Sequence, residues 1–241
     1  MRPADLEPVE DGGEAAESPG DRLGRSLVWI REQPVDERQA AARQVGESVR
    51  LVIDRLTATS APPEVLSEVA AKMEEVLALL KGYGSNRRYE GYAEASGAAH
   101  DRGFFDWSPQ LGLANPLAPP IQVDVEGEIV VGRARFGSAY EGPPGCLHGG
   151  FVAAAFDEVL GLAQTLSGQV GMTGTLNVRY RRPTPLYTDL RFEGRLEGVS
   201  GRKVSTSASL FAAGEVTAEA TGLFISVTPE HFSALTDNRP S

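Results

Sequence analysis

A nearly uncharged helical segment is the feature that most constrains how this chain folds. From Phe151 to Ser167 the apolar residues recur at three- and four-residue steps, which is the period of a helix. Asp157 and Glu158 are the only charged residues in this segment. A helix with so little charge is buried on most sides, so the rest of the chain has to surround it. The recurring apolar residues are Val152, Phe156, Val159, Ala163 and Leu166.

Alternating apolar and polar residues on both sides of this helix predict β-strands. Two candidate strands precede the helix and four follow it, at 121–125, 129–136, 171–181, 189–199, 202–212 and 215–227. Gly201 and the Ala213-Gly214 pair separate consecutive strands, as hairpin loops require. No further helix follows, so an antiparallel sheet has to cover this one by wrapping round it. The order predicts an α+β fold with six strands and one long central helix.

A loop rich in glycine and proline, residues 142–150, leads into the helix and ends in His148-Gly149-Gly150. The first N–H groups of a helix have no partner within it, and the helix dipole favours negative charge there. Glycines at this position let a ligand approach the backbone closely, so the site is suited to a carbonyl oxygen and the oxyanion that develops from it. The alternative is that the glycines only make the turn.

Asp157 is the first candidate for a reactive side chain. Ala153, Ala154 and Gly161 lie three or four residues away on its own face and leave room for another molecule. The alternative is a solvated acid at the helix surface. On strand 171–181, period-two alternation places one set of residues toward the helix and a polar set, beginning with Thr173, on the opposite face. The set expected to face the helix is Met172, Leu176, Val178 and Tyr180.

Composition excludes some classes of protein. The formal net charge of −10 argues against a general nucleic-acid binder, because phosphates require a basic surface. Cys146 is the only cysteine, so the chain cannot form an internal disulfide. The N-terminus lacks the apolar core of a secretory signal, and no apolar run approaches the length of a membrane span. These features predict a cytoplasmic protein.

Several motifs together resemble the hotdog-fold acyl-CoA thioesterases, in particular the phenylacetate-pathway type and its mammalian thioesterase-superfamily relatives. Asp157 follows His148 by nine residues, and Thr173 follows Asp157 by sixteen. The other motifs are Cys-Leu-His-Gly-Gly at 146–150, Leu-Asn-Val-Arg-Tyr-Arg-Arg-Pro at 176–183 and Gly-Arg-Lys at 201–203. The resemblance covers roughly residues 120–228. It implies hydrolysis of an acyl-CoA thioester to free acid and CoA, in a homodimer or tetramer whose site is shared between subunits. It implies no metal, and no cofactor beyond the CoA of the substrate.

The resemblance also implies roles for individual residues. Asp157 is expected to be the general base or nucleophile, Thr173 to place the attacking water, and the Gly149 N–H to donate to the oxyanion. Some relatives carry an Asn where this chain has Gly142, so His148 is expected to matter more here. Residues expected to bind substrate or the CoA phosphates are Gly150, Arg179, Arg181, Arg182, Arg202 and Lys203. The alternative for these basic residues is pairing with Glu193, Glu197 or Asp189 across strands.

Two other functions compete with hydrolysis. The first is a non-catalytic hotdog module that binds acyl-CoA, which the replacement of the Asn by Gly142 favours and the presence of Asp157 and Thr173 disfavours. The second, a hotdog dehydratase, requires an acid–base histidine within the helix, and the segment has none.

Outside the hotdog domain, assigned to 120–228, the chain divides into a disordered tail at 1–20, a helical extension and connector at 21–119, and a C-terminal tail at 229–241. Within the extension, helical periodicity over Asp36–Leu56 and Pro63–Lys81 predicts a hairpin that packs on the main domain or on a second copy. Residues 23–30 are expected to form a short strand or a docking segment.

Overall fold

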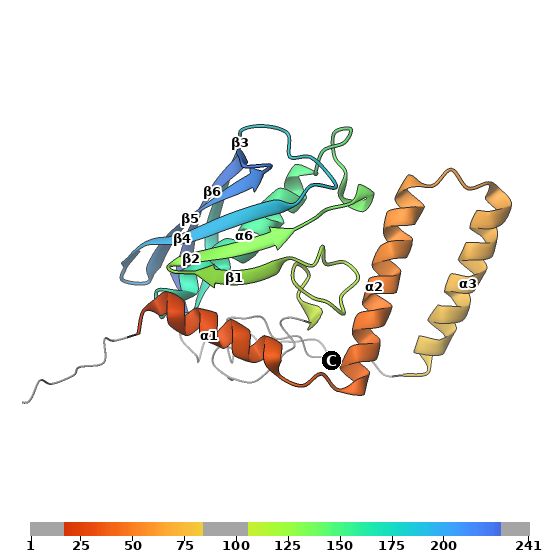
Figure 1. Cartoon of the computed structure of the whole chain (residues 1–241), viewed down its shortest axis with the longest axis horizontal. Helices are drawn as coiled ribbons and strands as arrows, with labels where there is room; N and C mark the ends of the chain where they lie inside the picture. Colours follow the sequence, from red (N-terminus) through yellow and green to blue (C-terminus); the bar gives the residue numbers. More distant parts are fainter. Residues whose placement is uncertain (1–16, 84–105, 228–241) are drawn as a thin grey trace, which may run out of the picture.

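The computed structural model describes residues 17–83 and 106–227 (Figure 1). Three helices come first, then two strands and a 3-10 turn, then the central helix and four further strands. In chain order these are α1 (Pro19–Glu32), α2 (Glu37–Ala58), α3 (Pro63–Lys81), β1 (Gln122–Glu126), β2 (Ile129–Ala134), η1 (Ser138–Tyr140), α6 (Gly149–Thr165), β3 (Gly171–Tyr180), β4 (Leu190–Ser200), β5 (Lys203–Ala212) and β6 (Glu215–Ser226).

The six strands form one antiparallel sheet in the order β1-β2-β4-β5-β6-β3, and this sheet curves round α6. The α+β architecture expected from the sequence is therefore confirmed. Phe156 of α6 meets Phe192 of β4 edge to face, with ring centroids 5.4 Å apart. The helix lies so close that a Cβ added at Gly132 or Gly194 would come within 2.9 Å or 2.8 Å of a Val159 methyl carbon. Two strand glycines thus set the distance between the sheet and the helix.

Strand β3 lies at one edge of the sheet, and most of its residues are exposed. Its pairing with β6 shifts between Thr173 and Thr175, so Gly174 forms a bulge. A bulge adds one residue and reverses which side chains face the helix beyond it. The other edge strand, β1, is covered by α1 (Figure 1). Within the described residues, β3 therefore presents the open edge of the sheet.

Residues 23–30, expected to form a short strand or a docking segment, lie in helix α1, which packs against β1. The Ser18 side chain accepts a hydrogen bond from the Asp21 N–H and caps the helix. Leu23 and Leu27, one helical turn apart, are both buried. This pairing, together with the cap, outweighs the strand preference of the residues that follow Leu27. The helix begins at Pro19, inside the segment expected to be a tail, and residues 1–16 and 229–241 lie outside the described part of the chain.

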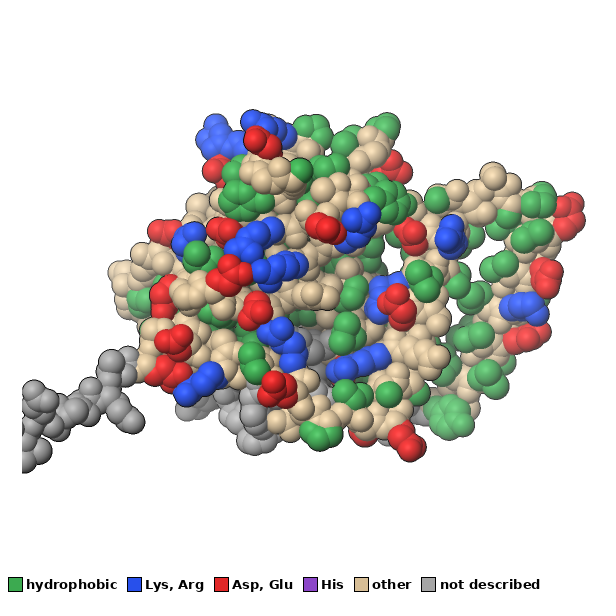
Figure 2. Space-filling model, in the orientation of Figure 1, with side chains coloured by type: hydrophobic (Ala, Val, Ile, Leu, Met, Phe, Trp, Pro, Cys, Tyr) green, Lys and Arg blue, Asp and Glu red, His purple; other side chains and the backbone are tan. Residues whose placement is uncertain are grey.

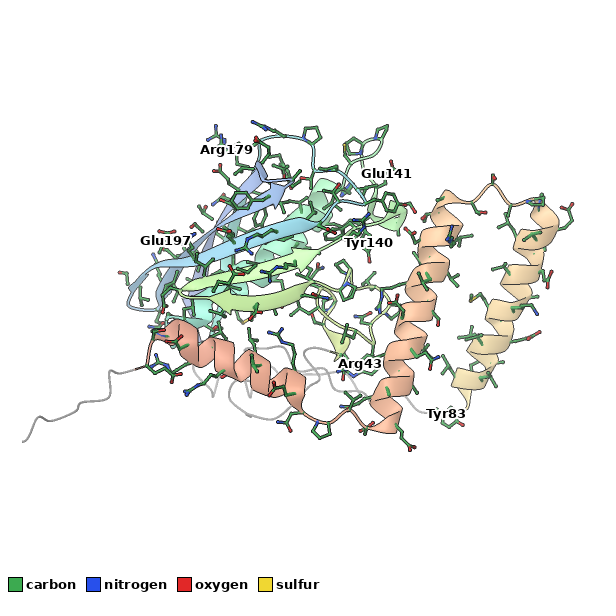
Figure 3. All side chains as sticks on the ribbon, in the orientation of Figure 1. Arg43, Tyr83, Tyr140, Glu141, Arg179 and Glu197 are labelled. Atoms are coloured by element: carbon green, nitrogen blue, oxygen red, sulfur yellow. The ribbon has the colours of Figure 1, made fainter. Side chains whose placement is uncertain are left out.

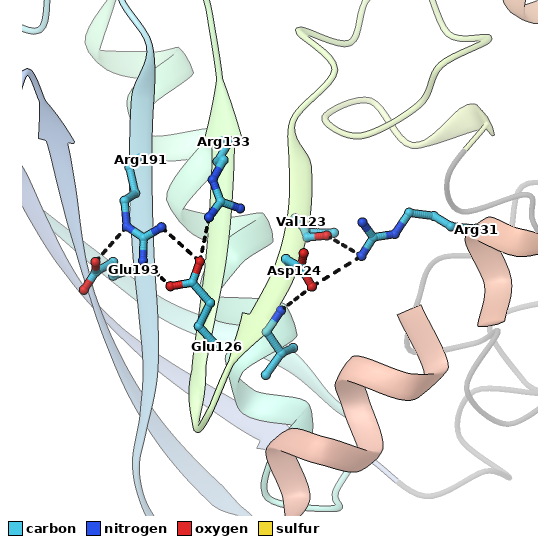
Figure 4. Close-up of polar contacts among 8 residues, drawn as sticks. Arg31, Val123, Asp124, Glu126, Arg133, Arg191 and Glu193 are labelled. Atoms are coloured by element: carbon cyan, nitrogen blue, oxygen red, sulfur yellow. Dashed lines mark hydrogen bonds and ion pairs between the residues drawn. The ribbon is translucent and has the colours of Figure 1, made fainter. Parts of the chain in front are cut away.

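Ion pairs hold α1 to β1 and brace the outer face of the sheet (Figure 4). Arg31 donates to the Val123 carbonyl over 2.9 Å and pairs with Asp124. Glu126 of β1 accepts hydrogen bonds from Arg191 of β4 and Arg133 of β2, and these two arginines lower the pKa of the Glu126 carboxyl to about 2.

The expected helical hairpin is present as α2 and α3, and α2 contacts the main domain through polar groups. Arg43 pairs with the buried Asp106 at 2.6 Å, and Arg50 donates to the carbonyl oxygens of Leu113 and Asn115. Further along α2, Asp54 accepts from the Ser138 N–H at 2.8 Å. In the described ranges, no helix combines the length and the apolar character needed to cross a membrane.

Candidate active site

Asp157 and Thr173 meet midway along α6. The Thr173 hydroxyl donates to the Asp157 carboxylate over 2.8 Å, and both residues are exposed in the single chain. This contact contradicts the expectation that Thr173 faces away from the helix. The bulge at Gly174 is the reason, because it lets Thr173 and the later residues Leu176 and Val178 face the same side. Met172 is on the outward face instead, with 48% of its surface exposed.

His148 and two glycines form the beginning of α6. The His148 ring accepts the Gly150 N–H through Nδ1 at 3.0 Å and caps the helix. An accepting Nδ1 places the proton of the neutral ring on Nε2. The Gly150 N–H is therefore occupied, which argues against its expected role as a substrate donor. The Gly149 N–H has no acceptor among the described residues, so it is the amide that this turn offers to a ligand.

Tyr180 supports the same turn, which the sequence did not reveal. Its hydroxyl donates to the Gly149 carbonyl oxygen over 2.8 Å. A Cβ added at Gly149 would lie 3.2 Å from the Tyr180 ring. The alternation of β3 placed Tyr180 correctly on the side of the helix but gave its hydroxyl no partner. The hydrogen bond holds the Gly149 carbonyl group in place and does not involve the Gly149 N–H.

The loop before the helix leaves no room for a side chain at Gly142. A Cβ there would lie 2.8 Å from the His148 Cα, and the Gly142 N–H donates to the Cys146 carbonyl at 2.9 Å. Tyr140, labelled in Figure 3, accepts the His148 N–H and stacks edge to face on Phe151, with ring centroids 4.8 Å apart. The polarising Asn of some relatives therefore cannot be restored by substitution without moving the backbone of His148.

The candidate basic residues do not form one surface within a single chain. Arg179 pairs in register with Glu219 of β6, whereas Lys203 is opposite Ile225, six residues further along the same strand. Six residues of a strand span about 20 Å. Arg179, Arg181 and Arg182 therefore cluster at one end of the sheet, and Arg202 and Lys203 at the other.

Ion pairing divides these residues further. Arg181 pairs with Glu219 and Arg182 with Glu215, while Arg202 donates to the Ser226 carbonyl. The acidic partners expected from the sequence bind other residues. Glu193 pairs with Arg191 and Arg195, and Asp189 pairs with Arg135. Glu197 accepts a hydrogen bond from Ser207 and lies away from Arg179 in Figure 3. Arg179 and Lys203 make no ion pair within the part of the chain that is described.

Glu158, next to Asp157, is half-buried and lies about 100° round α6 from it. The buried Ser108 hydroxyl lies 3.4 Å from its carboxyl oxygen. Burial, and then the negative charge of Asp157, raise the pKa of the Glu158 carboxyl to about 7 against a lowering by Ser108. The two neighbouring acids thus differ in character, with Asp157 solvated and Glu158 protonated through the acidic range.

Replacing Glu158 with Gln should flatten the dependence of stability on pH. Between pH 4.5 and about 7 the folded state keeps a proton on Glu158 that the unfolded state releases. Wild-type stability should therefore fall as pH rises through this window, by at most about 3 kcal/mol. Urea unfolding at pH 5 and pH 8 measures the difference. Parallel pH profiles for Glu158→Gln and wild type would contradict the assignment.

The fold agrees with comparisons to known proteins. The sequence model of the thioesterase superfamily matches residues 144–219. A crystal structure of a thioesterase superfamily protein superposes with a TM-score of 0.69 at 32% identity, over 80% of this chain and 93% of that chain. The chain therefore belongs to the thioesterase superfamily. Residues 120–228 are less than half of the 241 residues of this chain. Because the superposition covers 80% of the chain, it must also include part of the helical extension.

Curated relatives align with a shorter part of the chain. The acyl-coenzyme A thioesterase THEM4 of Bos taurus is 38% identical over 99 residues, which are 40% of this chain and 40% of the relative. THEM4 of Xenopus laevis is 40% identical over 96 residues, or 39% and 43% of the two chains. The acyl-coenzyme A thioesterase THEM5 of Homo sapiens is 30% identical over 99 residues. The matches thus span about two fifths of the relatives' length.

Proposed function

We propose that this protein hydrolyses acyl-CoA thioesters, with Asp157 as the reactive carboxylate. The observation that carries the proposal is the 2.8 Å hydrogen bond from the Thr173 hydroxyl to Asp157. It orients an exposed carboxylate on a helix whose only other acidic residue is the half-buried Glu158, and it leaves the remaining acceptor positions of Asp157 free. The naming of THEM4 and THEM5 as acyl-coenzyme A thioesterases supports the same substrate class.

The proposed reaction uses three groups of this chain. The thioester carbonyl oxygen accepts a hydrogen bond from the Gly149 N–H. This hydrogen bond strengthens as the oxygen becomes negative. Asp157 takes a proton from a water held beside Thr173, and the water oxygen bonds to the carbonyl carbon. Collapse of the tetrahedral intermediate breaks the carbon–sulfur bond and returns the proton to the CoA thiolate. In the alternative route Asp157 attacks directly and forms an anhydride, which water then cleaves.

These groups belong to one site only when two copies of the chain associate. Gly149 and Asp157 are eight residues apart on α6, which separates them by about 12 Å along the helix axis. One carbonyl group cannot contact both at hydrogen-bonding distance. The exposed β3 edge, which carries Thr173 and Tyr180, gives a second copy a surface to pair with. We therefore propose that the Asp157–Thr173 pair of one protomer faces Gly149 of its partner.

Among the candidate basic residues, Arg179 and Lys203 are proposed as contacts for the CoA phosphates. Both side chains are exposed, and neither is engaged by a carboxylate of the described chain. Arg181 and Arg182 would first have to leave Glu219 and Glu215. An arginine can donate two N–H groups to one phosphate, whereas a lysine acts as a single point charge, so Arg179 is expected to contribute more to CoA binding than Lys203.

A non-catalytic acyl-CoA-binding module is the second candidate, and Gly142 in place of the family's Asn favours it. Steady-state release of free thiol from acyl-CoAs of different chain length and aromaticity distinguishes the two functions. Hydrolysis predicts turnover of at least one substrate, together with a preference among acyl groups. Saturable binding of every acyl-CoA tested, with no thiol released by the wild type, would contradict the proposed reaction.

A further inference from the structure

Helix α3 has no partner within the described chain. Every one of its residues is exposed, and none is buried. Eight of these exposed side chains are large and apolar: Val65, Leu66, Val69, Met73, Val76, Leu77, Leu79 and Leu80. A helix of 19 residues depends on packing of its apolar face for most of its stability. An apolar surface of this size therefore indicates a partner outside the described chain.

The apolar side chains of α3 cover one side of the helix. At 100° per residue they fall within an arc of about 180°, and the opposite side carries Glu, Ser and Ala. The central residues are spaced three and four apart, as in a coiled coil: Leu66, Val69, Met73, Val76 and Leu80. A single neighbouring helix covers only a narrow seam, so half of the circumference requires more than one neighbour.

Helix α2 carries a second apolar seam, directed away from the main domain. Its contacts with the domain use the polar residues Arg43, Arg50 and Asp54. The seam, at a four-three-four spacing, consists of Val45, Val49, Val52 and Leu56. At 100° per residue it lies about 150° round the helix from that polar face. Val45 and Leu56 remain 54% and 55% exposed.

The two helices of the hairpin stand apart from each other. They run antiparallel after a connection at residues 59–62, and Figure 2 shows open space between them with apolar side chains on both sides. The hairpin therefore offers two apolar seams and a space that its own side chains do not fill.

Charge indicates which occupant fits. Helix α3 carries four glutamates and two lysines, so its polar side is acidic. An acidic helix is repelled by anionic lipid, whereas helices that lie on membranes are rich in Lys and Arg. Helix α2 carries four arginines against three acidic residues. Arg43 and Arg50 are already paired with Asp106 and Glu47, whereas Arg38 and Arg55 are exposed and make no ion pair within the described chain. Arg38 and Arg55 of an α2 helix therefore complement the acidic side of α3, and a second copy of this chain supplies such a helix.

We propose that the α2–α3 hairpin is a self-association surface, where the hairpins of two copies pack as a four-helix bundle. The apolar seams of α2 and α3 from both protomers then meet in one core, which gives each α3 the neighbours that its wide apolar face requires. This surface is separate from the β3 edge and does not depend on the proposed reaction.

Two double variants of the full chain test the proposal. Val69→Glu with Val76→Glu places charges within the α3 seam. Ala71→Glu with Ala78→Glu adds the same charges to its polar side, and all four substituted positions are exposed in the single chain. Sedimentation over a series of protein concentrations measures self-association. We expect the seam variant to lose protomers from the assembly, or to dissociate at least about 100-fold more readily, while the control matches wild type.

Three outcomes would overturn the proposal. Equal assembly masses and dissociation constants for all three proteins would show that the seam binds no second copy. A lower melting temperature of the seam variant at unchanged mass would show that the hairpin closes within one chain. Seam-dependent pelleting with phosphatidylcholine–phosphatidylglycerol vesicles, again at unchanged mass, would identify a lipid surface as the partner.

Discussion

Asp157→Ala is expected to lower kcat/KM for thioester hydrolysis by about 10²–10⁴-fold. The substitution removes the only carboxylate that Thr173 orients, and no other acid lies on the exposed face of α6. Stability should hardly change, because Asp157 is exposed and its loss opens no cavity. Thiol release measured beside a melting curve separates the two effects.

Glu158→Gln is the matched control for this variant, because it neutralises the adjacent acid, whose partner is Ser108 and not Thr173. It should retain hydrolysis while changing the pH dependence of stability. If Asp157→Ala turns over at the wild-type rate, or if Glu158→Gln loses as much activity as Asp157→Ala, the carboxylate has been assigned to the wrong residue.

Gly149→Pro is expected to lower the rate of hydrolysis by about 10²–10³-fold, equivalent to about 3–4 kcal/mol for one oxyanion donor. Proline is tolerated at the first position of a helix, where the lost N–H has no partner within the helix. His148 already has the extended backbone that a residue before proline requires, with φ −63° and ψ 133°. The substitution therefore removes the amide donor and leaves the turn intact.

Gly149→Ala provides the control, because it adds a Cβ but keeps the N–H. Both variants place this Cβ 3.2 Å from the Tyr180 ring, so the alanine variant reproduces that contact. The difference between their rates then reports the replacement of the amide N–H by the proline ring. Equal rates for the two variants would mean that the Gly149 N–H takes no part in the reaction.

The central helix and the six strands were predictable because each has a regular period and clear ends. Gly201 and Gly214 adopt positive φ angles of 59° and 82° in the hairpin turns where the sequence placed them. The position of Thr173 was not predictable, because strict alternation assigns it to the wrong face. Only the bulge at Gly174 reverses this, and a bulge depends on pairing with β6 rather than on local sequence.

Other parts of the site depend on contacts between distant segments. The bond from Tyr180 to Gly149 joins residues 31 positions apart, and the Ser108 hydroxyl that contacts Glu158 lies 50 positions before it in the sequence. Neither has a local signature in the sequence. Residues 23–30 were expected to form a short strand or a docking segment because they favour both strand and helix, and burial of Leu23 and Leu27 decided for a helix. The α2–α3 hairpin was predicted correctly, whereas the exposure of every residue of α3 could be seen only in three dimensions.

Mixing two inactive variants tests the shared site most directly. Asp157→Ala and Gly149→Pro each damage every site of a homodimer. After unfolding and refolding together in equal amounts, about half of the dimers should contain one chain of each kind, since identical interfaces pair at random. One of the two sites in such a dimer combines an intact Asp157 with an intact partner Gly149. We predict recovery of about a quarter of wild-type activity, and a mixture no more active than its separate components would contradict a site built across two chains.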